Sequence, residues 1–433
     1  MENIKNMLSF IDGSPSPFHA VANIAQQLDD AGYTRLYEQD DWKLEAGKGY
    51  YVCRNMSSVL AFRIPTAVKF GFNIVASHCD SPTFKIKENP QMTTGTYVTL
   101  NTERYGGMIM STWMDRPLSV AGRVMVREGN TFVQKLVNID RDLLIIPNLA
   151  IHMDRTQNDG KKFNPQVDMI PLYSLNKDGK SFMAMVAESA GVEEKDVIGH
   201  DLFLYNRQKG TVLGAEEDLV SCGKLDDLQC VYASMAGFIA SKDEKAMPVL
   251  AVFDNEEVGS STKQGAASTF LYDTLNRVVK ALGGKDHDYR KALANSFMIS
   301  ADNAHAMHPN QPGISDPTNR PAINKGIIIK YNANQRYTTD AVSAAIFKGI
   351  LNDIDVPYQT FANRSDILGG GTLGNISNNQ VALNTVDIGL PALAMHSAYE
   401  TGGVKDTLDL IKVCEKFFTL KFTKDGDYKI TVE

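Results

Sequence analysis

The pattern of apolar residues changes twice along this chain of 433 residues, and that change constrains the fold more than any other feature. After Leu213, short apolar runs with the length of buried strands alternate with longer segments of helical periodicity. The apolar runs are Met247–Phe253, Ser296–Ser300 and Ala392–Met395. The helical segments include Leu225–Ala240 and Asp340–Asn352. Apolar strands that alternate with helices predict a largely parallel sheet covered by helices on both faces.

The middle of the chain, from Lys85 to about Leu213, has a different pattern of apolar and polar residues. Short segments there alternate apolar and polar residues between turns of Gly, Asp and Asn, which favours a β-rich module. These segments are Thr96–Leu100, Val120–Val126 and Phe132–Val137. Before the module, we predict helix at Glu2–Leu28, broken by a turn at Ser14-Pro15-Ser16-Pro17, and then strands at Val59–Ile64 and Phe70–Ser77. We therefore predict an α/β domain formed by residues 1–86 and 222–433, interrupted by a β-rich module at residues 87–221.

Composition excludes several classes of protein. The chain has 44 Lys and Arg against 51 Asp and Glu, a formal charge of −7, and no basic stripe that would favour nucleic acid as a partner. Its longest apolar runs fall far short of the ~18 residues that a membrane-spanning helix needs. The five cysteines include no Cys-x-x-Cys pair, and the N-terminus lacks the pattern of a secretory signal. We expect a cytoplasmic protein in a reducing compartment, without a membrane or nucleic-acid partner.

Two of the eight histidines, His78 and His396, stand where apolar runs end. The carboxyl ends of strands are where α/β sheets place their sites. Strand alternation puts His78 and Asp80 on one face, so the carboxylate of Asp80 can orient the imidazole or support a metal ligand. A strand-end histidine hydrogen-bonded to a turn is the alternative for this motif alone.

A pair of adjacent acids, Glu256 and Glu257, follows the apolar strand that ends at Phe253. Neighbouring carboxylates repel each other, so a cation or a shifted pKa is needed to hold both at one strand end. Beside a divalent metal, one carboxylate can coordinate while the other accepts a proton from water. A solvated acidic helix start, favoured by the helix dipole, is the alternative.

Two further aspartates complete the candidate constellation. Asp226 opens a predicted helix, and Asp302 follows the apolar run that ends at Ser300. Either aspartate alone could be an N-cap. Together with two imidazoles and two glutamates, however, they supply the ligands of a two-metal hydrolytic centre. Nitrogen and oxygen ligands without thiolates suit Zn²⁺ and would also accept Mn²⁺ or Co²⁺.

Six motifs in this order resemble the M18 family of metallo-aminopeptidases, the aspartyl aminopeptidase family. They are Ser14-Pro15-Ser16-Pro17-Phe18-His19, Ser77-His78-Cys79-Asp80-Ser81-Pro82, Asp254-Asn255-Glu256-Glu257-Val258-Gly259, Ser300-Ala301-Asp302-Asn303-Ala304-His305, Asn332-Ala333-Asn334-Gln335-Arg336-Tyr337 and Met395-His396-Ser397. The resemblance covers essentially the whole chain. It implies a doubly wound catalytic domain with two Zn²⁺ ions per subunit, an inserted β-rich dimerisation domain, and assembly of dimers into a tetrahedral dodecamer.

The resemblance also implies a role for each site residue. The implied metal ligands are His78 and Asp302 at one ion, Glu257 and His396 at the other, and Asp226 at both. Glu256 would be the general base, and Asp80 would orient a ligand histidine. His152 would stabilise the oxyanion in a neighbouring subunit's active site, and the role of a metal ligand is the open alternative for this residue.

The candidate substrate contacts are His305, Asn334, Arg336, Gly370 and Thr372, and a loop histidine without an active role is the alternative for His305. Family members that prefer acidic N-terminal residues commonly carry a lysine where this chain has Asn334, which offers no charge to a substrate carboxylate. Arg336 and Lys330 are nearby in the sequence and are alternatives for that charge. An acidic preference is therefore left open, as is the effect of Gly371, which stands where the family often has serine.

The sequence thus predicts a zinc exopeptidase that removes N-terminal amino acids from peptides with free N-termini. A deacylase or dipeptidase that uses the same metals on a different amide is one alternative. A catalytically silent peptide-binding or assembly protein is another, which predicts a lost base or ligand. Here Glu256 and all five implied ligand positions carry competent residues.

Overall fold

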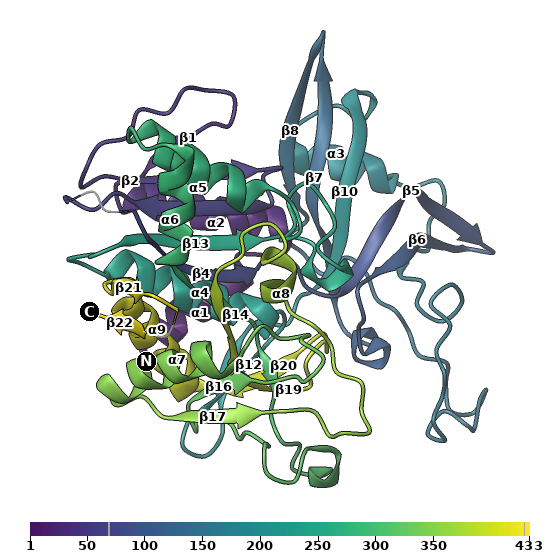
Figure 1. Cartoon of the computed structure of the whole chain (residues 1–433). Coiled ribbons are helices and arrows are strands. Elements are labelled where there is room, and N and C mark those ends of the chain that lie inside the picture. Colours follow the sequence, from purple (N-terminus) through teal and green to yellow (C-terminus); the bar gives the residue numbers. More distant parts are fainter. Residues whose placement is uncertain (68–69, 428) are drawn as a thin grey trace.

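The computed structural model describes residues 1–433 except 68, 69 and 428, and is built around a sheet of nine strands in the described residues (Figure 1). The strands lie in the order β1 (Thr34–Leu36), β2 (Gly49–Arg54), β3 (Ser58–Arg63), β13 (Met247–Phe253), β4 (Phe72–His78), β14 (Phe297–Ala301), β18 (Asn384–Gly389), β16 (Ile327–Lys330) and β17 (Tyr358–Phe361). The four central strands β13, β4, β14 and β18 are mutually parallel. The predicted α/β fold with a mostly parallel sheet is confirmed.

Alternate residues of the central strands enter two separate cores. On β3, Val59 and Ala61 belong to one core, whereas Leu60 and Phe62 belong to the other. The first core is closed by α1 (Glu2–Asp12), α2 (Pro17–Asp30), α4 (Leu225–Ala240), α7 (Ala341–Asp353) and α9 (Val404–Phe417). The second is closed by α5 (Phe270–Ala281), α6 (Asp286–Ala294) and α8 (Leu373–Ser377). Burial on both faces explains why these strands read as continuous apolar runs.

The helix boundaries follow local chemistry. Helix α2 begins at Pro17, whose missing N–H costs nothing in the first helical turn, so the Ser-Pro-Ser-Pro turn separates α1 from α2. Helix α7 begins after Asp340, whose side chain accepts a hydrogen bond from the backbone N–H of Ser343. Both boundaries agree with the helical segments that the sequence predicts.

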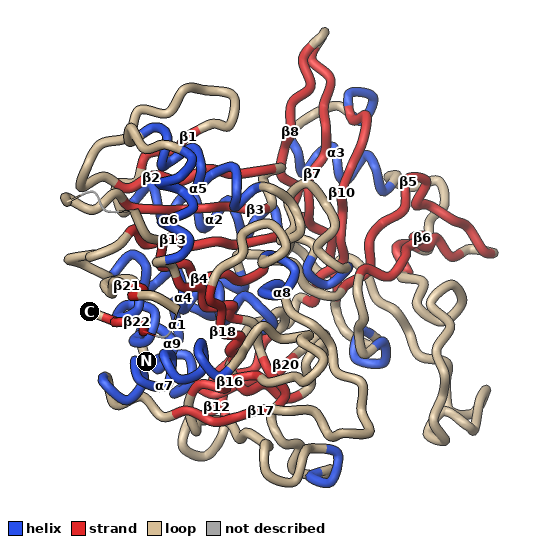
Figure 2. The backbone as a smooth tube through the Cα atoms, in the orientation of Figure 1, coloured by secondary structure: helices blue, strands red, loops and turns tan. Residues whose placement is uncertain are grey.

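The β-rich middle of the chain forms a six-stranded antiparallel sheet beside the central one, on the right in Figures 1 and 2. Its order is β8 (Thr131–Asn138), β7 (Leu118–Glu128), β10 (Val197–Asn206), β5 (Thr83–Thr94), β6 (Tyr97–Tyr105) and β9 (Leu172–Ser174). Helix α3 (Phe182–Ala190) packs against this sheet and shares its separate hydrophobic core. The predicted short strands are therefore present, although β6 extends to Tyr105, beyond the predicted end at Leu100.

A third sheet of five short strands joins distant parts of the chain. Its order is β11 (Thr211–Leu213), β12 (Leu219–Cys222), β20 (Glu400–Gly403), β19 (Pro391–Leu393) and β15 (Ala304–His305). The assignment of Ala392–Met395 to the parallel sheet was wrong, because β18 takes that place and β19 pairs with β20. Apolarity alone cannot tell which sheet a short run joins. The C-terminal strands β21 (Phe422–Asp425) and β22 (Lys429–Val432) form a separate hairpin.

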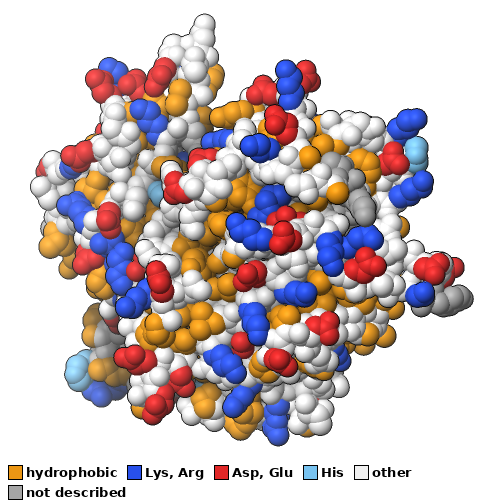
Figure 3. All heavy atoms as spheres, turned by 90° about the vertical axis from the view of Figure 1, so that its left-hand side faces the viewer, with side chains coloured by type: hydrophobic (Ala, Val, Ile, Leu, Met, Phe, Trp, Pro, Cys, Tyr) orange, Lys and Arg blue, Asp and Glu red, His pale blue; other side chains and the backbone are white. Residues whose placement is uncertain are grey.

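Acidic and basic side chains are interspersed over the face of the molecule in Figure 3. Among the described residues, none of the helices combines the length and apolarity that crossing a bilayer requires.

Candidate metal centre

Three neighbouring strands of the central sheet end at one edge and deliver the first set of polar side chains. Strand β4 ends at His78, and Phe253 at the end of β13 is in register with it. The acids Glu256 and Glu257 follow β13 in a short 3₁₀ turn, and Asp302 follows β14. Because β13, β4 and β14 are parallel, their carboxyl ends meet, as the sequence predicts.

The five-stranded sheet delivers the second set. Asp226 lies at the start of α4, four residues after β12, and His396 lies three residues after β19 in a left-handed backbone conformation, with φ of 66°. Glu400, the first residue of β20, ties these two segments together. Its carboxylate accepts hydrogen bonds from the backbone N–H groups of Asp226 (3.0 Å) and His396 (2.6 Å).

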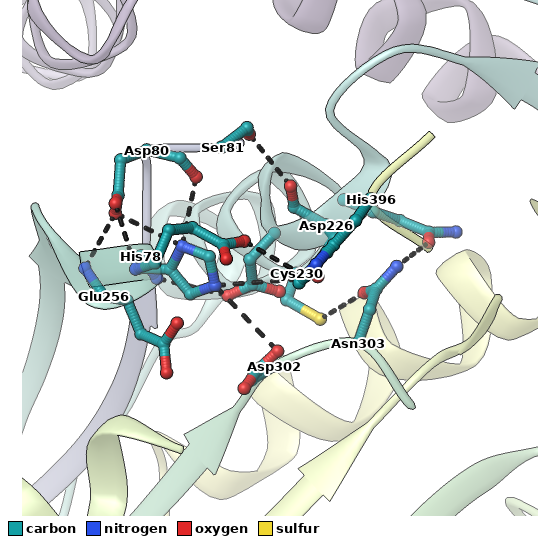
Figure 4. A network of polar contacts seen from close by, with 12 residues as sticks. His78, Asp80, Ser81, Asp226, Cys230, Glu256, Asp302, Asn303 and His396 are labelled. Carbon is teal, nitrogen blue, oxygen red and sulfur yellow. Dashed lines mark hydrogen bonds and ion pairs between the residues drawn. The ribbon is translucent and has the colours of Figure 1, made fainter. Parts of the chain in front are cut away.

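The carboxylate of Asp226 lies between the two imidazoles. Its Oδ1 is 3.6 Å from Nε2 of His78, and its Oδ2 is 3.3 Å from Nε2 of His396. On the outer sides, Asp302 Oδ1 lies 3.9 Å from His78 Nε2, and Glu257 Oε1 lies 3.4 Å from His396 Nε2. Figure 4 shows His78, Asp226, Asp302 and His396 converging from several elements. The five side chains therefore form two adjoining sets that share Asp226.

The ring orientation of His78 is fixed by a hydrogen bond on the side that faces away from the cluster. Its Nδ1 lies 3.1 Å from the carbonyl oxygen of Asp80, and since a carbonyl can only accept, Nδ1 carries the proton and Nε2 faces the cluster (Figure 4). The Asp80 carboxylate accepts hydrogen bonds from the backbone N–H groups of Glu256 (3.1 Å) and Glu257 (3.2 Å). Asp80 thus holds the 3₁₀ turn against the strand end.

The concentration of carboxylates shifts several pKa values. Burial, with repulsion from Asp302, raises the pKa of Glu256 to about 8. Burial and the charge of Asp226 raise the pKa of Glu257 well above its usual range. Burial alone would also raise the pKa of Asp226, but the two histidines outweigh it and lower that pKa. The basic groups of the protein therefore do not neutralise the carboxylates of this cluster, whereas a bound cation would.

The residues present fit a metal. Three groups of potential ligand atoms lie within 4.8 Å of one another: His78 with Asp227 and Asp302, His78 with Glu256 and Glu257, and Asp226 with Glu257 and His396. Among the described residues, three buried oxygens of these groups lack hydrogen-bond partners, namely Asp226 Oδ1, Asp227 Oδ1 and Glu257 Oε1. Buried polar atoms are rarely left unpaired. Imidazole and carboxylate ligands in this number suit Zn²⁺ and also accept Mn²⁺ or Co²⁺.

A cavity opens directly beside the cluster. His305, Gly370 and Thr372, which the sequence predicts as substrate contacts, line it together with Lys330, Tyr337 and Phe361. Lys330 is buried, lies 3.6 Å from Asp302 and donates to the carbonyl oxygen of Asn303.

Three other predicted residues lie apart from this cavity. Asn334 and Arg336 are exposed in the turn that precedes Tyr337 and are not among the described lining residues. His152 is exposed in the segment between β8 and β9. In the described residues, the groups that could hold a metal do not include His152.

Sequence reasoning missed several residues that the structure brings to the centre. Asp227 is adjacent to Asp226, and its Oδ2 accepts a hydrogen bond from the backbone N–H of His78 at 3.1 Å. The double aspartate was the available signal for it. No pattern in the sequence points to Glu400 or to Tyr105, whose hydroxyl donates a hydrogen bond to Asp80. Their contacts depend on how separate sheets pack together.

Comparisons with known proteins agree with this geometry. A family model described as "Aminopeptidase I zinc metalloprotease (M18)" matches residues 10–418. The "Probable M18 family aminopeptidase 2" of Clostridium novyi is 47% identical, over 96% of this chain and 98% of its own. The protein of the same name from Clostridium acetobutylicum is 46% identical, over 97% and 99%.

Solved structures give the same result. A cryo-EM structure of the Ape4 and Nbr1 complex contains a chain with a TM-score of 0.93 and 36% identity, over 96% of this chain and 85% of that one. The yeast mApe1 dodecamer has a TM-score of 0.83 and 27% identity, over 96% and 95%. With a family model that spans most of its length and relatives approaching half identity, the chain belongs to the M18 family of zinc metallo-aminopeptidases.

Proposed function

We propose that this M18 aminopeptidase removes single N-terminal residues from peptides with a free N-terminus, using two zinc ions and Glu256 as general base. The observation that supports this most is the position of Asp226, whose two oxygens face two different imidazoles. A carboxylate in that position can serve two ions at once, which is the arrangement of two-metal hydrolytic centres.

In this proposal, His78 and Asp302 hold one ion, Glu257 and His396 hold the other, and Asp226 holds both. Asp227, which lies with His78 and Asp302, is a further candidate ligand at the first ion. When bound, zinc polarises the peptide carbonyl and makes water easier to deprotonate. Mn²⁺ or Co²⁺ could replace it with the same ligands.

Glu256 moves the proton in this proposal. Its backbone is fixed by the hydrogen bond from its N–H to Asp80, so its side chain is presented at the cluster from a rigid turn. A carboxylate in this position can accept a proton from water and return it to the departing amine. Asp80 acts by orienting His78.

The charges that line the cavity bear on which N-terminal residue it would accept. The described residues that line the cavity include the cation Lys330. Its ammonium group already contacts the carboxylate of Asp302 and donates a hydrogen bond to the carbonyl oxygen of Asn303. His305 remains uncharged there, because burial and the nearby Lys330 lower its pKa. We therefore propose no strong preference for acidic residues within one subunit, with His305, Gly370 and Thr372 contacting substrate. Asn334 and Arg336 would act only at the rim.

We also propose that residues 87–221 form a dimerisation domain inserted into the catalytic domain of residues 1–86 and 222–433. Many large apolar side chains of this module are exposed, which marks a protein interface. They include Phe132, Leu149, Ile151, Met153, Val167 and Leu175. His152 lies among them, so assembly into a dodecamer like that of mApe1 could carry it to a neighbouring active site as an oxyanion donor. A cytoplasmic location remains a prediction.

Metal content and activity, measured before and after chelation, test this function. We expect about two equivalents of zinc per subunit, loss of activity on chelation, and recovery on adding zinc back. Full activity in a metal-free preparation would overturn the proposal. A panel of amino-acid anilides, dipeptides and N-acyl amino acids separates the alternatives, because only an aminopeptidase requires a free α-amino group on a chain of any length. Turnover of N-acyl substrates alone would indicate a deacylase.

A further inference from the structure

Three consecutive residues at the end of strand β6, Tyr105, Gly106 and Gly107, lie against both halves of the candidate metal centre. Strand β6 belongs to the six-stranded sheet, not to either sheet that supplies the cluster residues. Each of the three residues makes a different contact, and together these contacts reach His78, Glu257 and His396.

Tyr105 acts on the His78 half through Asp80. Its hydroxyl donates a hydrogen bond to Asp80 Oδ2 at 2.6 Å and accepts one from Asn255 Nδ2 at 2.8 Å. Asp80 in turn binds the Nδ1 of His78 through its carbonyl and both glutamate N–H groups through its carboxylate. The hydroxyl thus fixes the residue that fixes the His78 ring and the 3₁₀ turn.

Gly106 lets the segment pass close to Glu257. Its φ is +74°, and a Cβ placed there would lie 3.2 Å from the Cβ and 3.3 Å from the carbonyl oxygen of Glu257. Both the left-handed backbone and the close approach favour glycine. Glu257 therefore lies against a residue that has no side chain, and a larger residue there would push against it.

Gly107 acts on the His396 half. Its carbonyl oxygen lies 2.6 Å from Nδ1 of His396, so Nδ1 must carry the proton and Nε2 is left to face Asp226 and Glu257. Two residues on, the backbone N–H of Ile109 donates to the carbonyl oxygen of His396 at 2.9 Å. The ring and the backbone of His396 are thus both held by this segment.

We propose that Tyr105–Gly107 is a positioning segment through which the six-stranded module sets the geometry of both metal sites. The inference rests on the proposed metal centre and adds where its outer support comes from. Partners behind a ligand histidine fix its tautomer and direction, and their loss typically weakens metal binding about 10–100-fold. The module that carries the exposed apolar side chains is thereby connected to the metal ligands by hydrogen bonds rather than only by packing.

The first test replaces Tyr105 with Phe, which removes one hydroxyl and keeps the ring. Zinc affinity of metal-stripped protein is measured by competition with a chromophoric chelator, beside the thermal unfolding of the same metal-free samples. We expect Tyr105→Phe to bind zinc about 10-fold more weakly with little change in unfolding temperature. Tyr97→Phe, on the same strand and 53% exposed, is the matched control and should bind zinc like the wild type.

The second test compares two glycines of one hairpin. Gly106→Ala and Gly95→Ala both place a side chain on a left-handed residue, with φ of +74° and +61°, but only the Cβ at Gly106 meets a neighbour within 4 Å. Both variants therefore carry the cost of an alanine in a left-handed conformation, but only Gly106→Ala also places a Cβ against Glu257. We expect Gly106→Ala to weaken zinc binding about 10–100-fold and Gly95→Ala to leave it unchanged.

The outcomes separate this inference from the function on which it rests. If the wild type fails to bind zinc, the proposed function itself is wrong. If the wild type binds zinc and both Tyr105→Phe and Gly106→Ala bind it equally well, the positioning role is wrong while the metal centre stands. If zinc affinity falls only in proportion to a fall in unfolding temperature, with the controls falling likewise, the segment supports the fold and not the metal sites.

Discussion

The two halves of the metal centre are built in different ways. His78 stands at the end of a strand that is buried on both faces, and its side chain is only 1% exposed. His396 follows a strand of three residues, has a side chain that is 32% exposed, and is held by hydrogen bonds to Gly107 and Glu400. One half is thus fixed by the hydrophobic core, and the other by contacts with neighbouring sheets.

This difference has a consequence for metal binding. Strand register already places the backbone of the His78 half, and the six-stranded module reaches the His78 ring only indirectly, through Tyr105 and Asp80. The His396 ring and backbone are held directly by Gly107 and Glu400, so the His396 half should be the first to lose its ion.

The largest effect is expected for Glu256, which lies beside both halves and which we propose as the base. Glu256→Gln keeps the shape of the side chain but cannot accept the proton, so kcat should fall about 10²–10⁴-fold. Zinc content, measured by elemental analysis, should stay at the wild-type value. Glu415→Gln, at an exposed position of α9, is the control. Loss of zinc in Glu256→Gln would contradict its assignment as base and make it a ligand.

The comparison between the two histidines is tested directly by alanine at each. His78→Ala removes the imidazole beside Asp302 and one of the two imidazoles beside Asp226, so the metal-free protein should lose about 3 kcal/mol of unfolding free energy. His396→Ala removes a partly exposed group and should cost about 1 kcal/mol. Urea unfolding of both metal-free variants measures the difference. Equal losses would show that the two halves are not built differently.

A smaller effect is expected for Glu400, which joins Asp226 to His396. In Glu400→Gln one carboxylate oxygen becomes an amide, so one of the two backbone N–H groups faces a donor instead of an acceptor. Zinc affinity should fall about 10-fold. Chelator titration should show that one equivalent is lost before the other, since Glu400 holds two ligands of the His396 half, Asp226 and His396, but only the shared Asp226 of the His78 half. Simultaneous weakening of both equivalents would argue against it.

The smallest effect on the metal centre is expected for Asp406, a carboxylate at the start of α9 that lies outside the centre and should change only the pH dependence of stability. Burial raises its pKa to about 7, although it accepts hydrogen bonds from the backbone N–H groups of Asn324 and Gly326. Between its unfolded and folded pKa values the folded state binds more protons, so stability should fall as the pH rises from about 4 to about 7. The loss is at most about 4 kcal/mol.

Urea unfolding of Asp406→Asn at about pH 5 and about pH 8 checks this sign. The variant should lose the part of the pH dependence that Asp406 contributes, while its zinc affinity stays at the wild-type value. An unchanged difference between the two pH values would contradict the pKa shift. A change in zinc affinity would mean that this side of the third sheet is coupled to the metals.

The sequence could predict the residues that the central sheet delivers to the centre. His78, Glu256, Glu257 and Asp302 follow long apolar runs, and parallel strands bring such ends together by their register. Asp226 at a helix start and His396 at the end of an apolar run were also candidates from the sequence, and the family resemblance implied which ion each would hold. The strand before His396 was placed in the wrong sheet, because a run of a few apolar residues carries no information about its partner.

By itself, the sequence determined the α/β fold, the β-rich middle and the set of residue types that can hold zinc, since apolar periodicity and ligand chemistry are local properties. Only the tertiary structure decided that Tyr105, Gly106, Gly107 and Glu400 stand behind the metal ligands. These contacts join residues up to 289 positions apart across different sheets. Hydrogen bonds of this kind depend on how the sheets pack, and the residue types of the two partners do not predict that they pair.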